Sequence, residues 1–198
     1  MTLLDFHTHK PTAEGVVTPR SFGIHPWQAD AEESTSYEAF EARYRSAMQA
    51  AEWVGECGLD KVRGAAWERQ VELFEWQLRL AEQLDKPVVV HCVHAFNELM
   101  ALRRQYGATA WVVHGFTGSL PLAQQLHGMG IGLSFGAALL DPRREKVRQT
   151  LVALPFPFLL ETDTASAAIG DIYEAAATLR QTDVATLADT IKAYFDTL

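Results

Sequence analysis

Short apolar runs alternate along the chain with longer stretches in which apolar residues recur every three or four positions. The runs are rich in β-branched and aromatic residues, and most are apolar throughout rather than alternating with polar residues. Such runs are typical of strands buried on both faces of a parallel sheet. The expected strands cover residues 3–7, 20–25, 53–58, 88–92, 111–116, 131–136 and 158–163.

The stretches between these runs predict helices. In residues 67–84, one apolar stripe contains Trp67, Val71, Phe74, Leu78 and Ala81, and charged residues fill the other positions. The other expected helices cover residues 37–51 and about 95–106, 120–129, 143–153, 171–180 and 184–197. Repeated strand–helix units predict an α/β fold with a parallel sheet, either doubly wound or closed as a barrel, in a single domain over residues 1–198.

The connection between the first two runs is unusual. The segment "KPTAEGVVTPRS" contains Pro11, Gly15 and Pro19, which makes it too interrupted for a helix. We therefore expect an extended, helix-free segment over residues 11–19. We also expect about seven strands, with no eighth barrel strand between the first two.

Composition narrows the class of protein. With 198 residues, of which 48% are hydrophobic and 21% charged, the chain is an ordinary globular domain. No apolar run approaches the length of a membrane span, and the N-terminus lacks the pattern of a signal peptide. The net charge of −8 argues against broad binding to nucleic acid. We expect a cytoplasmic monomer with no membrane association and no obligate protein partner.

Histidines and carboxylates lie at or near the C-terminal ends of the expected strands. They are His7, His9, His25, Glu56, His91, His114 and Asp163. The carboxyl ends of the strands in a parallel barrel form one rim, and that rim carries the active site. Imidazole and carboxylate donors suit one or two divalent ions such as Zn²⁺ or Mn²⁺, and less plainly Mg²⁺.

The alternative is that these are structural residues. A single histidine at a strand end is more often a hydrogen-bonded structural residue than a metal ligand. Six candidate ligands at strand ends of one polarity are harder to explain in that way. Cys57 and Cys92 each adjoin a candidate ligand, but neighbouring side chains on a strand point to opposite faces. We therefore interpret both cysteines as small buried residues.

The order of these motifs resembles that of a known family. The series "DFHTH", "FGIHPW", "GECGLD", "PVVVHC", "VVHGFTGS", "GLSFG" and "LLETD" resembles the TatD-type metal-dependent hydrolases, which belong to the amidohydrolase-like barrels. The resemblance covers nearly the whole chain and implies a distorted (β/α) TIM-type barrel in a short form lacking one βα unit. It also implies deoxyribonuclease or phosphodiesterase activity, with a phosphodiester substrate such as short DNA.

The resemblance implies a two-metal centre. One ion takes His7, His9, Glu56 and Asp163, and the other takes Glu56, His91 and His114, so that Glu56 bridges the two. Asp163 and Glu56 are then the catalytic residues, and Asp163 can also accept a proton from the attacking water.

Other residues are expected to contact the substrate. His25 matches the family's G-x-H-P motif, and His94 stands where the family has Asp. Lys10 and Arg63, with Lys61 as a further candidate, could contact phosphate.

Some positions depart from the family pattern. Val93 replaces an Arg, "KVRG" replaces an aromatic pair, and "ETDTAS" lacks a Pro. Three functions therefore stay open: a phosphodiesterase or nuclease, a metal-dependent hydrolase of a small ester, amide or lactone, and a non-catalytic binding protein on the same scaffold. The complete ligand set argues against the third.

Overall fold

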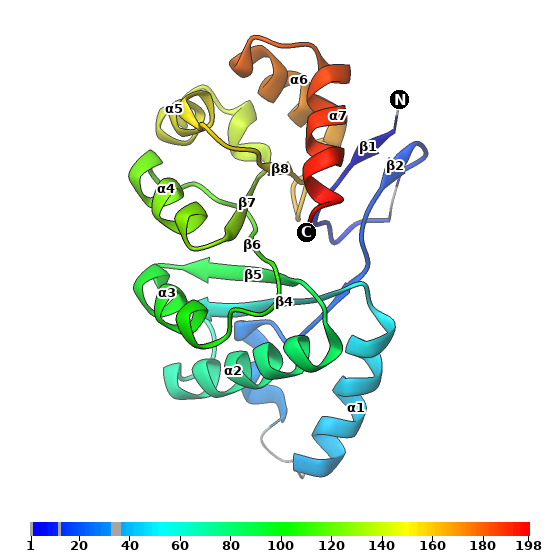
Figure 1. The fold of residues 1–198 in the computed structure, drawn as a ribbon, viewed down its shortest axis with the longest axis vertical. Coiled ribbons are helices and arrows are strands. Elements are labelled where there is room, and N and C mark those ends of the chain that lie inside the picture. Colours follow the sequence, from blue (N-terminus) through cyan, green and yellow to red (C-terminus); the bar gives the residue numbers. More distant parts are fainter. Residues whose placement is uncertain (1, 12, 33–36) are drawn as a thin grey trace. The chain divides into compact units, whose positions relative to one another are not determined.

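The computed structural model describes residues 2–11, 13–32 and 37–198. It divides into two compact units. The middle unit is Arg20–Val113, and the terminal unit combines Met1–Pro19 with His114–Leu198. Each unit alternates strands with helices and so follows the expected α/β pattern (Figure 1).

The middle unit contains a parallel sheet. Its strands pair in the order β3 (Ser21–Phe22), β4 (Trp53–Asp60), β5 (Val88–Val93) and β6 (Trp111–Val113). Its helices are the 3₁₀ helix η1 (Pro26–Glu32), α1 (Tyr37–Ala50), α2 (Trp67–Leu84) and α3 (Phe96–Gln105). Helix α2 packs on β4 and α3 packs on β5 (Figure 1).

The terminal unit contains two pairs of parallel strands. They are β1 (Leu3–Leu4) with β2 (Val16–Val17), and β7 (Ile131–Phe135) with β8 (Leu159–Leu160). Its helices are α4 (Leu120–Gly128), the 3₁₀ helix η2 (Ala137–Leu140), α5 (Glu145–Ala153), α6 (Ile169–Arg180) and α7 (Val184–Phe195). The amide of Phe6 donates a hydrogen bond to the carbonyl of Leu160 at 2.9 Å, which ties the chain after β1 to β8.

The continuous apolar runs are buried strands, as expected. Every residue of β6, β7 and β8 is buried, and only Glu56 interrupts the burial of β4. On α2, Phe74, Leu78 and Ala81 are buried, whereas Trp67 and Val71 are half-buried.

Helix α6 begins at Ile169, two residues earlier than expected. The carboxylate of Asp171 accepts a hydrogen bond from the amide of Ala168 at 3.3 Å, and this contact caps the first turn.

The segment between β1 and β3 corrects one expectation. It contains no helix in its described residues, as predicted, but Val16 and Val17 form an additional short strand beside β1. The amide of Leu3 donates to the carbonyl of Gly15 at 3.1 Å, and that of Asp5 donates to the carbonyl of Val17 at 2.9 Å. The expected absence of a further strand here is therefore wrong, because the two β-branched residues supply backbone partners for β1.

The second expected strand is shorter than predicted. It ends at Phe22 rather than residue 25. A Cβ atom on Gly23 would lie 2.6 Å from the Cα of Gly55, so the two backbones approach too closely for any other residue. Beyond Gly23, the backbone of Ile24 bonds to a side chain of α2 instead of a neighbouring strand.

Candidate metal centre

Close packing between β4 and β5 positions Glu56. A Cβ atom on Gly55 would lie 2.4 Å from the carbonyl oxygen of Val89, and one on Gly58 would lie 2.0 Å from that of His91. Only glycine allows this approach, so the motif "GECG" is a strand segment rather than a turn. The pairing places Gly58 opposite His91 and brings Glu56 beside the imidazole.

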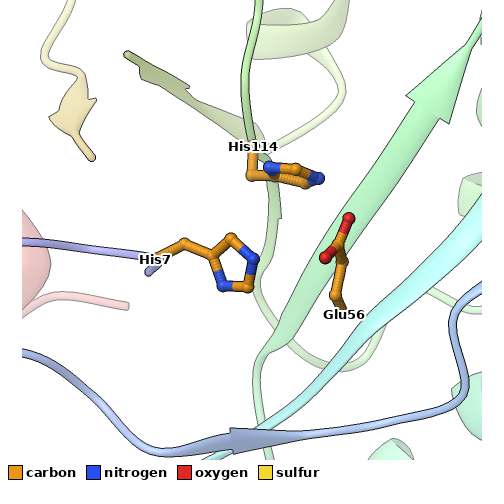
Figure 2. A group of neighbouring side chains, drawn as sticks. All are labelled: His7, Glu56 and His114. Atoms are coloured by element: carbon orange, nitrogen blue, oxygen red, sulfur yellow. The ribbon is translucent and has the colours of Figure 1, made fainter. Parts of the chain in front are cut away.

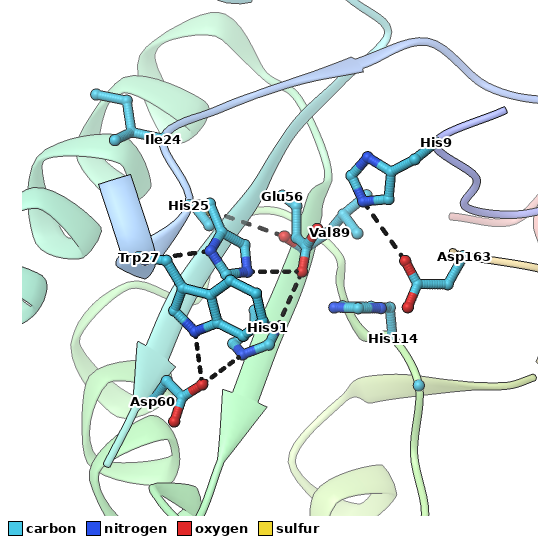
Figure 3. Close-up of polar contacts among 12 residues, drawn as sticks. His9, Ile24, His25, Trp27, Glu56, Asp60, Val89, His91, His114 and Asp163 are labelled. Atoms are coloured by element: carbon cyan, nitrogen blue, oxygen red, sulfur yellow. Dashed lines mark hydrogen bonds and ion pairs between the residues drawn. The ribbon is translucent and has the colours of Figure 1, made fainter. Parts of the chain in front are cut away.

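His25, Glu56 and His91 form a compact group in the middle unit (Figure 3). Glu56 Oε1 lies 2.9 Å from His91 Nδ1 and 3.2 Å from His25 Nε2. The amide of Trp27 donates to His25 Nδ1 at 3.1 Å, so the proton of a neutral His25 is on Nε2. One potential ligand atom from each member lies within 4.8 Å of the others.

Asp60 is a second carboxylate at this group. Its Oδ2 lies 3.2 Å from His91 Nε2 and accepts a hydrogen bond from the indole Nε1 of Trp27 at 2.8 Å (Figure 3). Its Oδ1 accepts from the amides of Val62 and Arg63 at 2.8 and 3.0 Å. Burial alone would raise the pKa of Asp60, but these hydrogen bonds outweigh it and lower the pKa below its usual value.

Two buried glutamines of α2 fix the backbone around this group. The side-chain amide of Gln70 accepts from the amide of Asp60 at 2.8 Å and donates to its carbonyl at 3.0 Å. Gln77 makes the same pair of bonds with Ile24, at 2.7 and 3.2 Å. Each glutamine therefore makes the two backbone hydrogen bonds that a neighbouring strand would otherwise make, Gln70 at Asp60 and Gln77 at Ile24, immediately before His25.

The terminal unit brings His7, His9 and Asp163 together. The amide of Asp163 donates to the carbonyl of His7 at 2.9 Å, and the amide of His9 donates to the carbonyl of Asp163 at 3.2 Å. This ladder sets His9 Nε2 3.4 Å from Asp163 Oδ1. Asp163 has a φ of 48°, a left-handed conformation that is uncommon for a residue other than glycine and is frequent at functional sites.

His114 lies beside His7 in the same unit. The centroids of their rings are 4.9 Å apart (Figure 2). His114 Nδ1 lies 3.4 Å from Oε1 of Glu161, a fully buried carboxylate. The amide of Gly115 donates to the same oxygen at 2.6 Å, and the hydroxyl of Ser134 donates to Oε2.

Asp5 is buried behind this ladder. Its carboxylate accepts hydrogen bonds from the amide and the hydroxyl of Thr162 at 2.8 and 2.7 Å. Burial raises the pKa of Asp5, and the two bonds from Thr162 offset only part of that effect. Asp5 therefore anchors the strand end that carries His7.

The chemistry of both groups fits a divalent ion. In each unit, two imidazoles and one carboxylate offer potential ligand atoms within 4.8 Å of one another: His7, His9 and Asp163 in one, and His25, Glu56 and His91 in the other. Nitrogen and carboxylate oxygen ligands suit Zn²⁺ and Mn²⁺. Five of the six residues expected to bind metal thus belong to these groups, and the sixth, His114, lies beside His7.

Of the two neighbouring histidines after β5, the structure brings His91 to Glu56. His94 is exposed and has a φ of 54°. Among the described residues it belongs to none of the groups that could hold an ion.

The expected phosphate contacts are exposed. The Lys10 amide donates to Thr8 Oγ1 at 3.2 Å, and the Arg63 guanidinium carbon lies 3.7 Å from the ring centroid of Trp27. Lys61 pairs with Glu98.

The two cysteines are in neither group. Cys57 is fully buried, and burial raises the pKa of its thiol. Cys92 is half-buried rather than buried, and burial raises its pKa to about 12. Neither thiol is therefore ionised near neutral pH.

Sequence reasoning missed the residues that orient the candidate ligands: Asp60, Glu161, Gln70 and Gln77. Asp60 and Glu161 were present in the quoted motifs "GECGLD" and "LLETD". The glutamines stand seven residues apart, two helical turns, and each is three residues after an apolar member of the α2 stripe. A polar residue repeated on an apolar face is the signal that could have identified them.

Parallel strands followed by imidazole and carboxylate donors define the class of metal-dependent hydrolases with an α/β barrel fold. The chain belongs to the TatD family. The family model described as "TatD related DNase" matches residues 14–198.

Two curated relatives illustrate the match. The Escherichia coli K12 protein named "uncharacterized metal-dependent hydrolase YjjV" is 34% identical over 146 residues, which cover 72% of this chain and 56% of YjjV. The "3'-5' ssDNA/RNA exonuclease TatD" of Edwardsiella piscicida is 36% identical over 149 residues, which cover 71% of this chain and 55% of that protein. The chain thus spans little more than half the length of these relatives.

Solved structures confirm the expected fold class. The crystal structure of E. coli YjjV superposes with a TM-score of 0.76 at 26% identity, covering 91% of this chain and 75% of YjjV. Dihydroorotase from Campylobacter jejuni has a TM-score of 0.58 at 9% identity, covering 93% and 66% of the two chains, and shows likeness of fold alone. Among the described residues, no helix has both the length and the apolar character needed to cross a membrane.

Proposed function

We propose that this chain is a metal-dependent phosphodiesterase that hydrolyses single-stranded nucleic acid. The observation that carries the proposal is the set of imidazole and carboxylate donors His7, His9 and Asp163, together with Glu56 and His91, in a chain of the TatD family. A curated relative of that family is named as an exonuclease of single-stranded DNA and RNA. We further propose that the protein acts in the cytoplasm as a monomer.

The proposed ligands of one or two divalent ions are His7, His9, Glu56, His91, His114 and Asp163. An ion held there would supply Lewis-acid activation of water and of the phosphoryl group. Zn²⁺, Mn²⁺ and Mg²⁺ are the candidate ions, and Glu56 is the proposed bridging carboxylate.

Asp163 is the proposed proton acceptor. Its carboxylate is about one third exposed, so water can reach it, and His9 Nε2 lies 3.4 Å from Oδ1. The two backbone bonds with His7 and His9 hold the backbone of Asp163 in its left-handed conformation, at the end of the strand pairing that brings His9 beside its carboxylate.

His25 is a proposed substrate contact. Because Trp27 fixes the proton on Nε2, this nitrogen is a donor. It faces Glu56 Oε1 at 3.2 Å in this structure and could instead donate to a phosphate oxygen of a bound substrate. Lys10, Arg63 and His94 are further proposed contacts. All three are exposed, and the cations are suited to phosphate.

The test is an activity assay with a choice of electrophile. Metal-free protein would be supplied with Mn²⁺, Zn²⁺ or Mg²⁺ and incubated with a 5′-labelled single-stranded oligonucleotide, bis-p-nitrophenyl phosphate or p-nitrophenyl acetate. We expect metal-dependent cleavage of the two phosphodiesters. Glu56→Gln and Asp163→Asn should each reduce cleavage by at least about 100-fold, whereas Glu72→Gln, on an exposed residue of α2, should not. Cleavage of the acetate alone would instead assign the chain to hydrolysis of small esters.

A further inference from the structure

The environment of His91 differs at its two ring nitrogens. Nδ1 lies 2.9 Å from Glu56 Oε1, and Nε2 lies 3.2 Å from Asp60 Oδ2. The imidazole is therefore held between two carboxylates, of which only Glu56 belongs to the group that could hold an ion. Both contacts lie within the middle unit (Figure 3).

The hydrogen bonds of Asp60 define its role. Oδ2 accepts from the indole of Trp27, whose Nε1 can only donate. Oδ1 accepts from the amides of Val62 and Arg63. Since both oxygens of Asp60 already act as acceptors, Nε2 of His91 is the donor to Asp60 when the other nitrogen, beside Glu56, binds a metal.

Asp60 is also rigidly held. Its side chain is only 3% exposed. Gln70 bonds to both the amide and the carbonyl of Asp60, so the backbone is fixed as firmly as the carboxylate. Because these bonds fix the position of the Asp60 carboxylate, it can hold the imidazole of His91 in one orientation.

We propose that Asp60 is a positioning residue for His91: it accepts a hydrogen bond from Nε2–H, so that Nδ1 is the nitrogen presented to the metal beside Glu56. This inference rests on the proposed function. Carboxylates behind ligating imidazoles select the tautomer and the ring orientation, and their loss typically weakens metal binding 10- to 100-fold.

The structure suggests a specific substitution and a control. Asp60→Asn replaces one carboxylate oxygen with an NH₂ group, which can only donate. The single remaining oxygen cannot accept from Trp27, both backbone amides and His91 together, so the imidazole of His91 loses the acceptor that orients it. Trp27→Phe removes the other donor to Oδ2 and leaves the bond to His91. Asp141→Asn is a control for losing a carboxylate that accepts from the backbone amide two residues later, as Asp60 does from Val62. Asp141 Oδ1 accepts from the amide of Arg143 at 3.0 Å.

The first measurement is the affinity for Zn²⁺ alone, from chelator competition at about pH 8.5, roughly two units above the ordinary imidazole pKa. We expect Asp60→Asn to weaken binding at least 10-fold and the two controls to stay within about threefold. Equal affinity for Asp60→Asn and the wild type would overturn the proposal. An equal loss of Zn²⁺ affinity in Trp27→Phe would also overturn it, since the hydrogen bond between Asp60 and the indole, rather than the one to His91, would then explain the effect.

The second measurement needs no substitution at Asp60 and decides the matter if that variant does not fold. In zinc-loaded wild-type protein with ¹⁵N-labelled histidine, His91 should show a protonated Nε2 and a zinc-bound Nδ1, with His91→Gln used to assign the signals. A protonated Nδ1 with zinc on Nε2 overturns this inference and leaves the metal-dependent function standing. A wild-type protein that binds no zinc, manganese or magnesium overturns both.

Discussion

The side chain of Gln77 offers a sharp test of how the fold supports the candidate site. It is 1% exposed, and its amide satisfies both the N–H and the C=O of Ile24, which is itself 4% exposed. Gln77→Met keeps the volume and the helix propensity of the residue but removes both hydrogen bonds. Ile24 would then have two buried backbone groups without these partners.

The expected loss follows from the cost of such groups. A buried donor or acceptor left unsatisfied costs about 1–3 kcal/mol. Two groups, less the favourable burial of the methionine side chain, predict a decrease of about 2–4 kcal/mol in the free energy of unfolding. Urea unfolding followed by circular dichroism measures this directly.

The matched control is Gln83→Met on the same helix. Gln83 is exposed, and its oxygen accepts a bond from Arg45 at 3.0 Å. We expect a change within about 0.5 kcal/mol, as is usual for surface substitutions. A loss below about 1 kcal/mol for Gln77→Met, or equal losses in the two variants, would show that the pairing with Ile24 contributes nothing.

Three further predictions concern packing, pH and metal. Gly58→Ala places a Cβ atom 2.0 Å from the carbonyl oxygen of His91, at a φ of 146°. In urea titration it should lower the free energy of unfolding by at least about 2 kcal/mol. Gly128→Ala is the control, because its Cβ atom would meet nothing within 4 Å, and it should cause no such loss. Hydrogen bonds from Thr186 lower the pKa of Asp183, so its stabilisation is complete above the ordinary pKa of about 3.9 and is lost as the pH falls through the lower, folded-state pKa. In thermal unfolding, Tm should fall less between about pH 6 and pH 2 for Asp183→Asn than for the wild type. Zn²⁺ at about 100 times its dissociation constant should stabilise metal-free protein by about 2.7 kcal/mol, and excess chelator should reverse the shift in Tm; an unchanged Tm would contradict metal binding by the folded state.

Much of the architecture was determined by the sequence. Continuous apolar runs identify buried parallel strands because both faces of such a strand must be covered, and the apolar stripe of α2 identifies its packed face. The candidate ligands could also be found, since His91 and Glu56 stand at or near the ends of recognisable strands and belong to recognisable motifs.

Only the tertiary structure decided how these residues are oriented. Linear spacing does not reveal that Gly58 admits the backbone of His91, or that Asp60 lies at the opposite side of that imidazole from Glu56. The additional strand at Val16–Val17 also escaped prediction, because two residues carry no periodicity and their partner, Leu3–Leu4, is distant in sequence. Hydrogen bonds between distant residues depend on direction as well as residue type, and direction is fixed only when the strands and helices have packed.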